Sequence, residues 1–74
     1  MTKHHHTDAF SRWVRFEEVP VGGTFFFRNE WWIKEKPPED SGFSTRFVAA
    51  QRSTNSVRLM GLPDTEEVQY SAAN

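Results

Sequence analysis

The chain has 74 residues, and its nine lysines and arginines nearly balance its ten acidic residues, which leaves a formal net charge of −1. This length fits one domain with a small core, and the charge balance argues against binding polyanions through overall positive charge. There is no cysteine, so no disulfide supports the fold. Stability has to come from seven Phe, three Trp and one Tyr, whose rings each bury on the order of 150–250 Å².

The sequence also predicts where the protein works. No apolar run approaches the roughly 20 residues that a membrane span needs, and the N-terminus lacks the apolar core of a signal peptide. Together with the absence of cysteine, this predicts a cytosolic protein that does not associate with membranes. We expect it to be a monomer.

The two ends of the chain differ from its middle. Residues 1–11 show no sustained apolar pattern, so they are expected to form a flexible arm, and residues 71–74 a flexible tail, around a single small β domain at 12–70. His4, His5 and His6 lie in the arm. An ordered metal site needs ligands fixed by a scaffold, so no metal site is predicted there.

Turn signals divide the domain into short segments with β-branched and aromatic content. Pro20 with Gly22 and Gly23 ends one segment, and a loop of prolines, acids and glycine follows at 37–42. Between these signals, strands are predicted at 13–16, 24–28, 31–36, 43–49, 57–60 and 66–70, with room for one helical turn at 17–19. The fold class is therefore mostly β: a small curled antiparallel sheet or a partly open β-barrel with at most one short helical turn.

The segment from Thr24 to Lys34 is the most apolar part of the chain and reads as a β-hairpin. A two-residue turn at Asn29-Glu30 would place Phe27 opposite Trp32. Side chains alternate between the faces of a strand, so both faces of this hairpin carry large apolar side chains. Only one of them can face the core of a two-layer domain.

We expect the face with Phe25, Phe27 and Trp32 to point inward, because Phe25 and Phe27 continue the pattern after the Gly-Gly turn. Lys34 shares this face, and we expect its stem to follow the rim of the core while its amine reaches water. The other strands are expected to add Phe43, Phe47, Leu59 and Val68 to the core.

The opposite face would then present an apolar patch beside arginine, a composition typical of interaction sites. The residues predicted to bind a partner are Trp13, Arg15, Phe26, Arg28, Trp31 and Ile33. An alternative is that Trp13 and the N-terminal segment fold over this face and bury it. The sequence does not decide between these two arrangements.

Catalytic chemistry has little support in the sequence. The acids occur as adjacent pairs at 17–18, 39–40 and 66–67, and adjacent residues of a strand point to opposite faces, which hinders work as a paired acid and base. There is no cysteine nucleophile, and every histidine lies in the arm. We therefore predict a binding protein with no catalytic residues and no cofactor.

Binding of single-stranded nucleic acid is the main alternative function. Small β-barrels stack bases on exposed aromatic rings while basic side chains follow the phosphates. Phe26, Trp31, Arg28, Arg46 and Arg58 are the residues that would serve this purpose. The net negative charge and the acids Glu30 and Glu35 argue against it. A third possibility is a structural or accessory module that binds protein.

The chain also resembles a pattern found in small phage and bacterial proteins: an aromatic residue, a short turn, a glycine, a strand with alternate phenylalanines, and a lysine after the hairpin. The matching residues are Phe16, Gly22, Phe25, Phe27, Trp32 and Lys34, and residues 64–68 resemble the end of that pattern. In length, tail and aromatic content the chain is similar to the small transcription regulators of lytic phages that bind bacterial RNA polymerase. That resemblance implies a protein that binds the host polymerase, hinders sigma-dependent initiation and lets elongation pass terminators.

Overall fold

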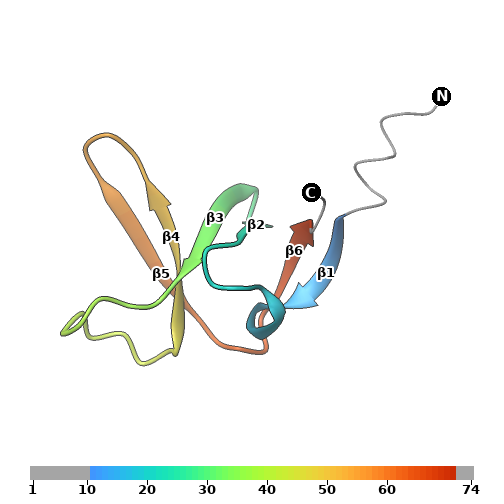
Figure 1. Ribbon diagram of the computed structural model, residues 1–74, viewed down its shortest axis with the longest axis horizontal. Helices are drawn as coiled ribbons and strands as arrows, with labels where there is room; N and C mark the ends of the chain where they lie inside the picture. The colour runs from blue at the N-terminus through green and yellow to red at the C-terminus, as the bar shows by residue number, and fades with distance from the viewer. Residues whose placement is uncertain (1–10, 72–74) are drawn as a thin grey trace.

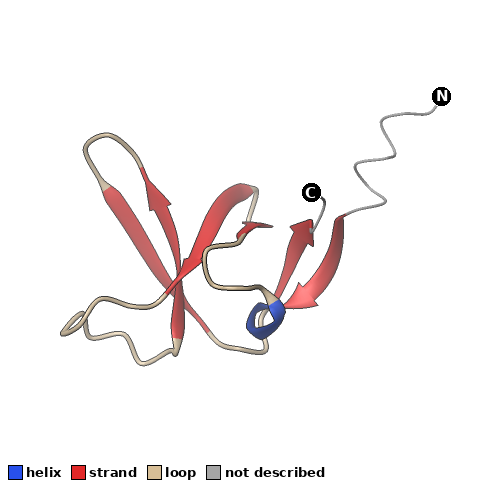
Figure 2. Cartoon of the chain, viewed as in Figure 1, coloured by secondary structure: helices blue, strands red, loops and turns tan. Residues whose placement is uncertain are grey.

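The computed structural model describes residues 11–71 as a single antiparallel β-sheet with one turn of 3-10 helix (Figures 1 and 2). The predicted mostly β fold with one short helical turn is confirmed. The elements in chain order are β1 (Ser11–Arg15), η1 (Phe16–Glu18), β2 (Thr24–Phe27), β3 (Glu30–Glu35), β4 (Phe47–Arg52), β5 (Val57–Leu62) and β6 (Glu67–Ser71).

The six strands are arranged in the order β1-β6-β2-β3-β4-β5, so the last strand of the chain is inserted between the first two. The edge strands β1 and β5 do not pair with each other, and the sheet is open. Strands β1 and β6 lie at one side of Figure 1, and the β4–β5 hairpin extends at the other. Ser11 of the predicted arm belongs to β1, and Ser71 of the predicted tail belongs to β6. The other residues of the arm and the tail, including His4 to His6, lie outside the described residues.

The β2–β3 turn lies one residue earlier than expected. Arg28 and Asn29 occupy the two turn positions with φ values of 53° and 65°, and two positive φ values are what a type I′ hairpin turn requires. Phe25 therefore pairs with Trp32, and Phe27 with Glu30. The predicted Asn29-Glu30 turn is wrong. Every cross-strand partner moves by two positions, however, so each side chain of β2 and β3 keeps the face assigned to it, while Arg28 moves into the turn.

The inner face of the sheet carries the core, which η1 and the loop after it cover. Phe16, Phe25 and Val68 have no exposed surface, and Trp32 is 4% exposed. The rings of Phe16 and Phe25 meet edge to face with centroids 5.3 Å apart. The inward positions of Phe25, Trp32 and Val68 are confirmed, while Phe27 and Phe47 are half-buried against the same cluster.

The core contributions of the second half of the chain differ from those predicted. Residues 43–46 form a loop rather than a strand, and the Phe43 ring is 36% exposed. In β5 the inward residues are Met60 and Leu62, which pair with Ala49 and Phe47, whereas Leu59 faces outward. The predicted core positions of Phe43 and Leu59 are therefore wrong.

Gly61 lets β5 continue past Met60 while the loop at 43–46 packs against its outer face. It pairs with Val48 on the outer face, where a Cβ atom would lie 2.8 Å from the Thr45 hydroxyl and 3.1 Å from the Phe43 ring. Only a residue without a side chain lets the loop at 43–46 approach the strand so closely. The loop covers this end of the outer face, and Val48 is completely buried beneath it.

Lys34 lies inside the molecule, and the expectation that its amine reaches water is wrong. It is 2% exposed, and its Nζ donates hydrogen bonds to the carbonyl oxygens of Phe16 at 2.9 Å and Val19 at 2.7 Å. The ammonium also lies 4.9 Å from the Phe16 ring centroid and 4.4 Å from that of Phe47. Lys34 thus connects the sheet to the segment that covers its core.

Replacing Lys34 tests this connection. Lys34→Met keeps an apolar stem but removes the donor to the buried Val19 carbonyl, at about 1–3 kcal/mol, and one of the two donors to the Phe16 carbonyl, which keeps the Val19 N–H. We expect urea denaturation to show a loss of about 2–4 kcal/mol in the free energy of unfolding. Lys36→Met, at the exposed position directly after β3, should change the free energy of unfolding by less than about 0.5 kcal/mol. Equal effects of the two variants would contradict the assigned role of Lys34.

The pH dependence of stability supplies a second test of Lys34. Burial lowers the pKa of its ammonium from the ordinary value of 10.5, and the nearby Asp64 carboxylate opposes this only in part. Between the lowered pKa and 10.5, the unfolded chain binds more protons than the folded chain, so the free energy of unfolding rises with pH. The free energy of unfolding of the wild type minus that of Lys34→Met should therefore increase with pH as the pH approaches 10.5 from below. A decrease would mean that the carbonyls and rings hold the proton better than water does.

Candidate interaction surface

The outer face of the sheet carries a row of side chains that crosses four strands. Trp13 of β1 pairs with Gln69 of β6, Gln69 with Phe26 of β2, and Phe26 with Trp31 of β3. Residues directly opposite each other share a face. The topology therefore joins aromatic residues from the start of the chain and from the central hairpin in one line, which we call the aromatic row.

The aromatic row is open to solvent. Trp13 is 64% exposed and Trp31 is 60% exposed, the two largest exposed fractions among the large hydrophobic side chains of the described chain. Phe26 is half-buried, and its ring meets that of Trp31 edge to face at 5.2 Å. Trp13 is thus a member of this face rather than a cover over it, while residues 1–10 lie outside the described part of the chain.

The other predicted partner-binding residues are distributed differently. Ile33 lies on the outer face beside Trp31, opposite Thr24. Arg15 lies on the same face two residues after Trp13, and its guanidinium contacts Glu17 at 3.4 Å and Glu18 at 3.8 Å. Arg28 was expected opposite Trp31, but it occupies the hairpin turn instead, with its guanidinium 5.1 Å from the Phe27 ring centroid.

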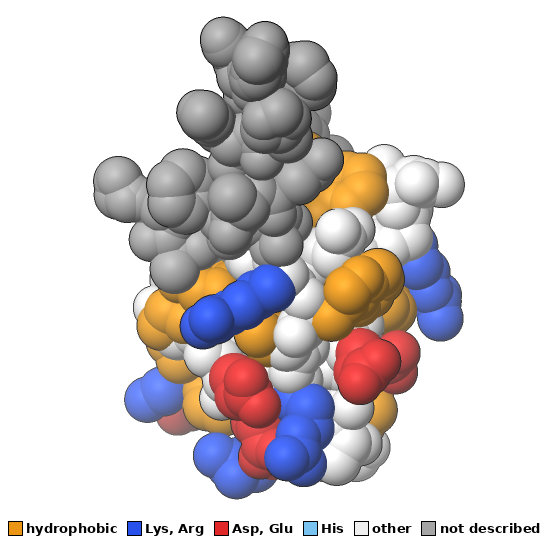
Figure 3. Space-filling view, turned by 90° about the vertical axis from the view of Figure 1, so that its right-hand side faces the viewer, with side chains coloured by type: hydrophobic (Ala, Val, Ile, Leu, Met, Phe, Trp, Pro, Cys, Tyr) orange, Lys and Arg blue, Asp and Glu red, His pale blue; other side chains and the backbone are white. Residues whose placement is uncertain are grey.

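Most arginines of the described residues contact a carboxylate. Arg46 lies 3.1 Å from Asp64. Arg58 lies 3.0 Å from Glu30, and Arg52 forms two hydrogen bonds with Glu35. Figure 3, which views the β1–β6 side, likewise shows acidic and basic side chains next to each other. Positive charge is therefore dispersed and largely neutralised.

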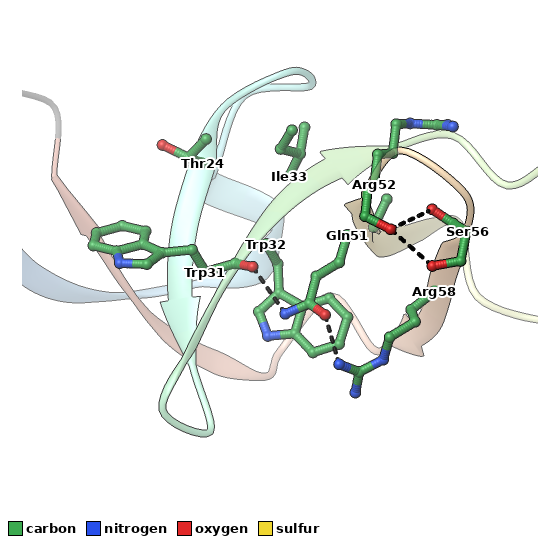
Figure 4. A pocket seen from close by; sticks show the side chains of 10 residues that line it. Thr24, Trp31, Trp32, Ile33, Gln51, Arg52, Ser56 and Arg58 are labelled. Atoms are coloured by element: carbon green, nitrogen blue, oxygen red, sulfur yellow. Dashed lines mark hydrogen bonds between the residues drawn. The ribbon is translucent and has the colours of Figure 1, made fainter.

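A pocket opens where β3 and β4 separate. Their pairing ends at Ile33 and Ala50, and beyond this point the β2–β3 and β4–β5 hairpins diverge (Figure 1). The space between them has a volume of about 470 Å³ (Figure 4). It is lined by Thr24, Trp31, Trp32, Ile33, Ala50, Gln51, Arg52, Ser53, Ser56 and Arg58. Trp31 thus belongs both to the aromatic row and to this pocket.

A polar network lies beside the pocket. The Gln51 amide donates to the Glu30 carboxylate at 2.7 Å and to the Trp31 carbonyl at 3.1 Å, and Arg58 donates to the Gln51 side-chain oxygen at 2.7 Å. Hydrogen bonds from Gln51 and Arg58 lower the pKa of Glu30, and those from Arg52 lower the pKa of Glu35. Both acids therefore stay ionised at neutral pH and hold the two arginines in place.

No group of three or more histidine, cysteine, aspartate or glutamate side chains suited to a metal ion occurs within residues 11–71. Among the helical segments of the same residues, none is long and apolar enough to cross a membrane. What the outer face does present is exposed indole rings, an apolar pocket and hydrogen-bond donors from arginine and serine.

Comparison with known proteins yields no match: neither a family model, nor a curated protein, nor a solved structure is similar to this chain.

Several residues of this surface were missed in the sequence. Gln69 completes the aromatic row, yet nothing in its neighbourhood shows that β6 lies between β1 and β2. Gln51 and Arg52 lie beyond the strand predicted at 43–49, but they are the last residues of β4 and border the pocket. The polar run Ser53 to Ser56 was a signal for the hairpin connection, though not for a binding pocket.

Two neighbouring tryptophans test which face is buried. Trp31→Ala removes a side chain that is 60% exposed and should lower the free energy of unfolding by about 1 kcal/mol or less. Trp32→Ala empties a core position that is 4% exposed and should cost about 3–5 kcal/mol. Urea denaturation measures both values. A larger loss of stability for Trp31→Ala than for Trp32→Ala would mean that the opposite face of the hairpin is the buried one.

Proposed function

We propose that this protein is a small β domain that acts by binding another protein through the outer face of its sheet, without catalysing a reaction. The observation that carries the proposal is the aromatic row, in which Trp13 and Trp31 are more than half exposed on one continuous face. Exposed aromatic side chains next to arginine are the groups that most often dominate the energy of protein interfaces.

The arrangement of charge favours a protein partner over a single-stranded nucleic acid. A nucleic-acid groove needs unpaired cations along the phosphate path. Here Arg46 and Arg58, two of the arginines considered for that purpose, contact Asp64 and Glu30. Interspersed charges of both signs are common at the rim of a protein interface, where they select the partner.

Bacterial RNA polymerase is the partner that we propose, on the strength of the resemblance to small phage transcription regulators. The protein would then work in the bacterial cytosol, as a monomer, and lower sigma-dependent initiation, with antitermination as a further effect. The support for this partner is the resemblance, whereas the support for the binding face is the exposed aromatic row.

The test uses the full chain and purified bacterial RNA polymerase without DNA. We expect the two to elute together in size-exclusion chromatography, and we expect the protein to lower transcription from a sigma-dependent promoter. Trp31→Ala and Trp13→Ala should each weaken binding by about 2 kcal/mol or more, because aromatic anchors at the centre of an interface have effects of that size.

The control is Val21→Ala, which shortens an exposed hydrophobic side chain in the turn before β2 and should leave binding unchanged. A single-stranded DNA oligonucleotide is titrated in parallel at several salt concentrations. Binding to the oligonucleotide with steep salt dependence, together with no binding to polymerase, would replace this proposal with the nucleic-acid alternative.

A further inference from the structure

The outer edge of β5 is a row of backbone groups that the described chain leaves unpaired. β5 is the last strand of the sheet, and β4 is the only strand of the described chain that pairs with it. The β4–β5 hairpin closes with a hydrogen bond from the Ser53 N–H to the Ser56 carbonyl at 2.9 Å. From there, hydrogen-bonded pairs alternate with non-bonded pairs along the antiparallel ladder. The N–H and C=O groups of Val57, Leu59 and Gly61 therefore point away from β4.

A second set of contacts fixes the same alternation from the other side of β4. The Lys34 N–H donates to the Gly23 carbonyl at 3.0 Å, and the Lys34 carbonyl accepts from the Gly22 N–H at 2.8 Å. Lys34 therefore turns its backbone away from β4, and the hydrogen bonds between β3 and β4 fall to the neighbouring pair that includes Ala50. Because Ala50 bonds to β3, its partner in β5, Leu59, keeps its N–H and C=O free.

β5 lacks the features that usually protect an edge strand from pairing. Protected edges are very short, or they carry proline, lysine or a bulge. β5 has six residues without proline or lysine, and it pairs with β4 without a bulge. Its one charged residue, Arg58, lies over the Trp32 ring on the inner face and contacts Glu30 at 3.0 Å. The other edge strand, β1, carries two arginines among five residues. β5 is therefore the edge that is better suited to pairing with another strand.

Two exposed hydrophobic side chains lie along this edge and belong to neither the core nor the aromatic row. Val57 is 50% exposed at the start of β5, and Phe43 is 36% exposed. Phe43 lies over the outer face of the strand at Gly61, because a Cβ atom at that glycine would lie 3.1 Å from the ring. Val57, Leu59 and Gly61 share this outer face. An apolar surface therefore follows the unpaired edge from one end of β5 to the other.

We propose that β5 pairs with β5 of a second copy of this chain, antiparallel and about a two-fold axis at Leu59. A row of alternating N–H donors and C=O acceptors is matched by another extended polypeptide backbone. In this register Leu59 lies opposite its own copy, and Val57 of each chain lies opposite Gly61 of the other. Val57 then packs beside the Phe43 ring of the second copy, so the two exposed side chains cover each other.

The sequence of β5 is complementary to itself in this register and not in the neighbouring ones. With the axis at Leu59, Arg58 lies opposite Met60 of the second copy, so no like charges meet. A pairing shifted by two residues would place the two Arg58 side chains directly opposite each other, which is unfavourable. The opposite shift would place Val57 opposite Pro63, which has no N–H to donate. This self-complementarity favours a second copy as the occupant of the edge.

This inference goes beyond the proposed function and does not depend on it. The aromatic row crosses β1, β6, β2 and β3, so pairing at β5 leaves the row open in both copies. Because a single pair of strands is a small interface, the dimer forms at high protein concentration. On dilution it separates into the monomers that we propose to act on polymerase.

The experiment follows the isotopically labelled full chain from about 10 µM to about 1 mM, the range in which so small an interface associates. In sedimentation equilibrium we expect the average mass to rise from that of one chain towards that of two. Over the same range, hydrogen exchange measured by NMR should slow at least about threefold at the amides of Val57 and Leu59. The Met60 amide, whose N–H bonds to β4, should change less.

Two substitutions at the axis give a matched pair. Leu59→Lys and Leu59→Glu each place like charges opposite each other and should weaken the dimer by about tenfold or more. An equimolar mixture of the two should restore association, because opposite charges then face each other. Val21→Lys adds a charge at an exposed hydrophobic position in the turn before β2 and should weaken the dimer by less than about twofold. If the Leu59 variants lose the native amide spectrum, Val57→Lys replaces them in the comparison with Val21→Lys.

A mass that stays at one chain, association that survives the charges at the edge, or a mixture that does not associate would overturn the inference. Self-association that Trp31→Ala abolishes would overturn it in favour of contacts between aromatic rows. Failure here can be separated from failure of the proposed function, because Leu59→Lys should still bind polymerase and Trp13→Ala should still form the dimer. If Leu59→Lys loses polymerase binding and Trp13→Ala keeps it, the edge of β5 receives the polymerase instead of a second copy.

Discussion

The Lys34 ammonium is the contact on which the inner side of this fold depends. Apart from the single 3-10 turn η1, the described chain has no helix with which to cover a six-stranded sheet. The short turn leaves the Val19 carbonyl without a backbone donor. Lys34 supplies that donor from the sheet and adds a second one to the Phe16 carbonyl, which also accepts from the Val19 N–H. The rings of Phe16 and Phe47 contact the same charge, so a single side chain joins the sheet to the segment that covers its core.

A cover of this size reaches only one face, and the exposure of the outer face follows from that. The loop at residues 36–46 approaches the outer face at Gly61 and buries Val48, but Trp13 and Trp31 stay open. In so small a domain, burying both faces of the central hairpin would require a further layer. Part of the aromatic surface therefore stays exposed to water, which is unfavourable unless a partner covers it.

The central hairpin and its facing were predictable, because its alternation is strong and its boundaries carry clear turn signals. The second half of the chain was less so. Phe43 and Thr45 alternate like strand residues, yet the Thr45 hydroxyl donates to the Phe47 carbonyl at 2.8 Å, a local bond that competes with strand pairing. In β5, Leu59 and Met60 are both apolar, so periodicity alone cannot show which faces inward. Gly61 decides this through a contact with a distant loop.

On the candidate surface, too, the features set by alternation along one strand were predictable, and those set by contacts between distant strands were not. The error in the hairpin turn moved every partner by two positions, which is a whole period of strand alternation, so Phe26, Trp31 and Ile33 kept their predicted face. Arg28 did not, because it became a turn residue. The extent of the surface depends on β6 lying between β1 and β2, and the pocket depends on β3 and β4 separating after Ile33. Alternation along a strand predicts neither feature, because both depend on which strands become neighbours and over how many residues they pair.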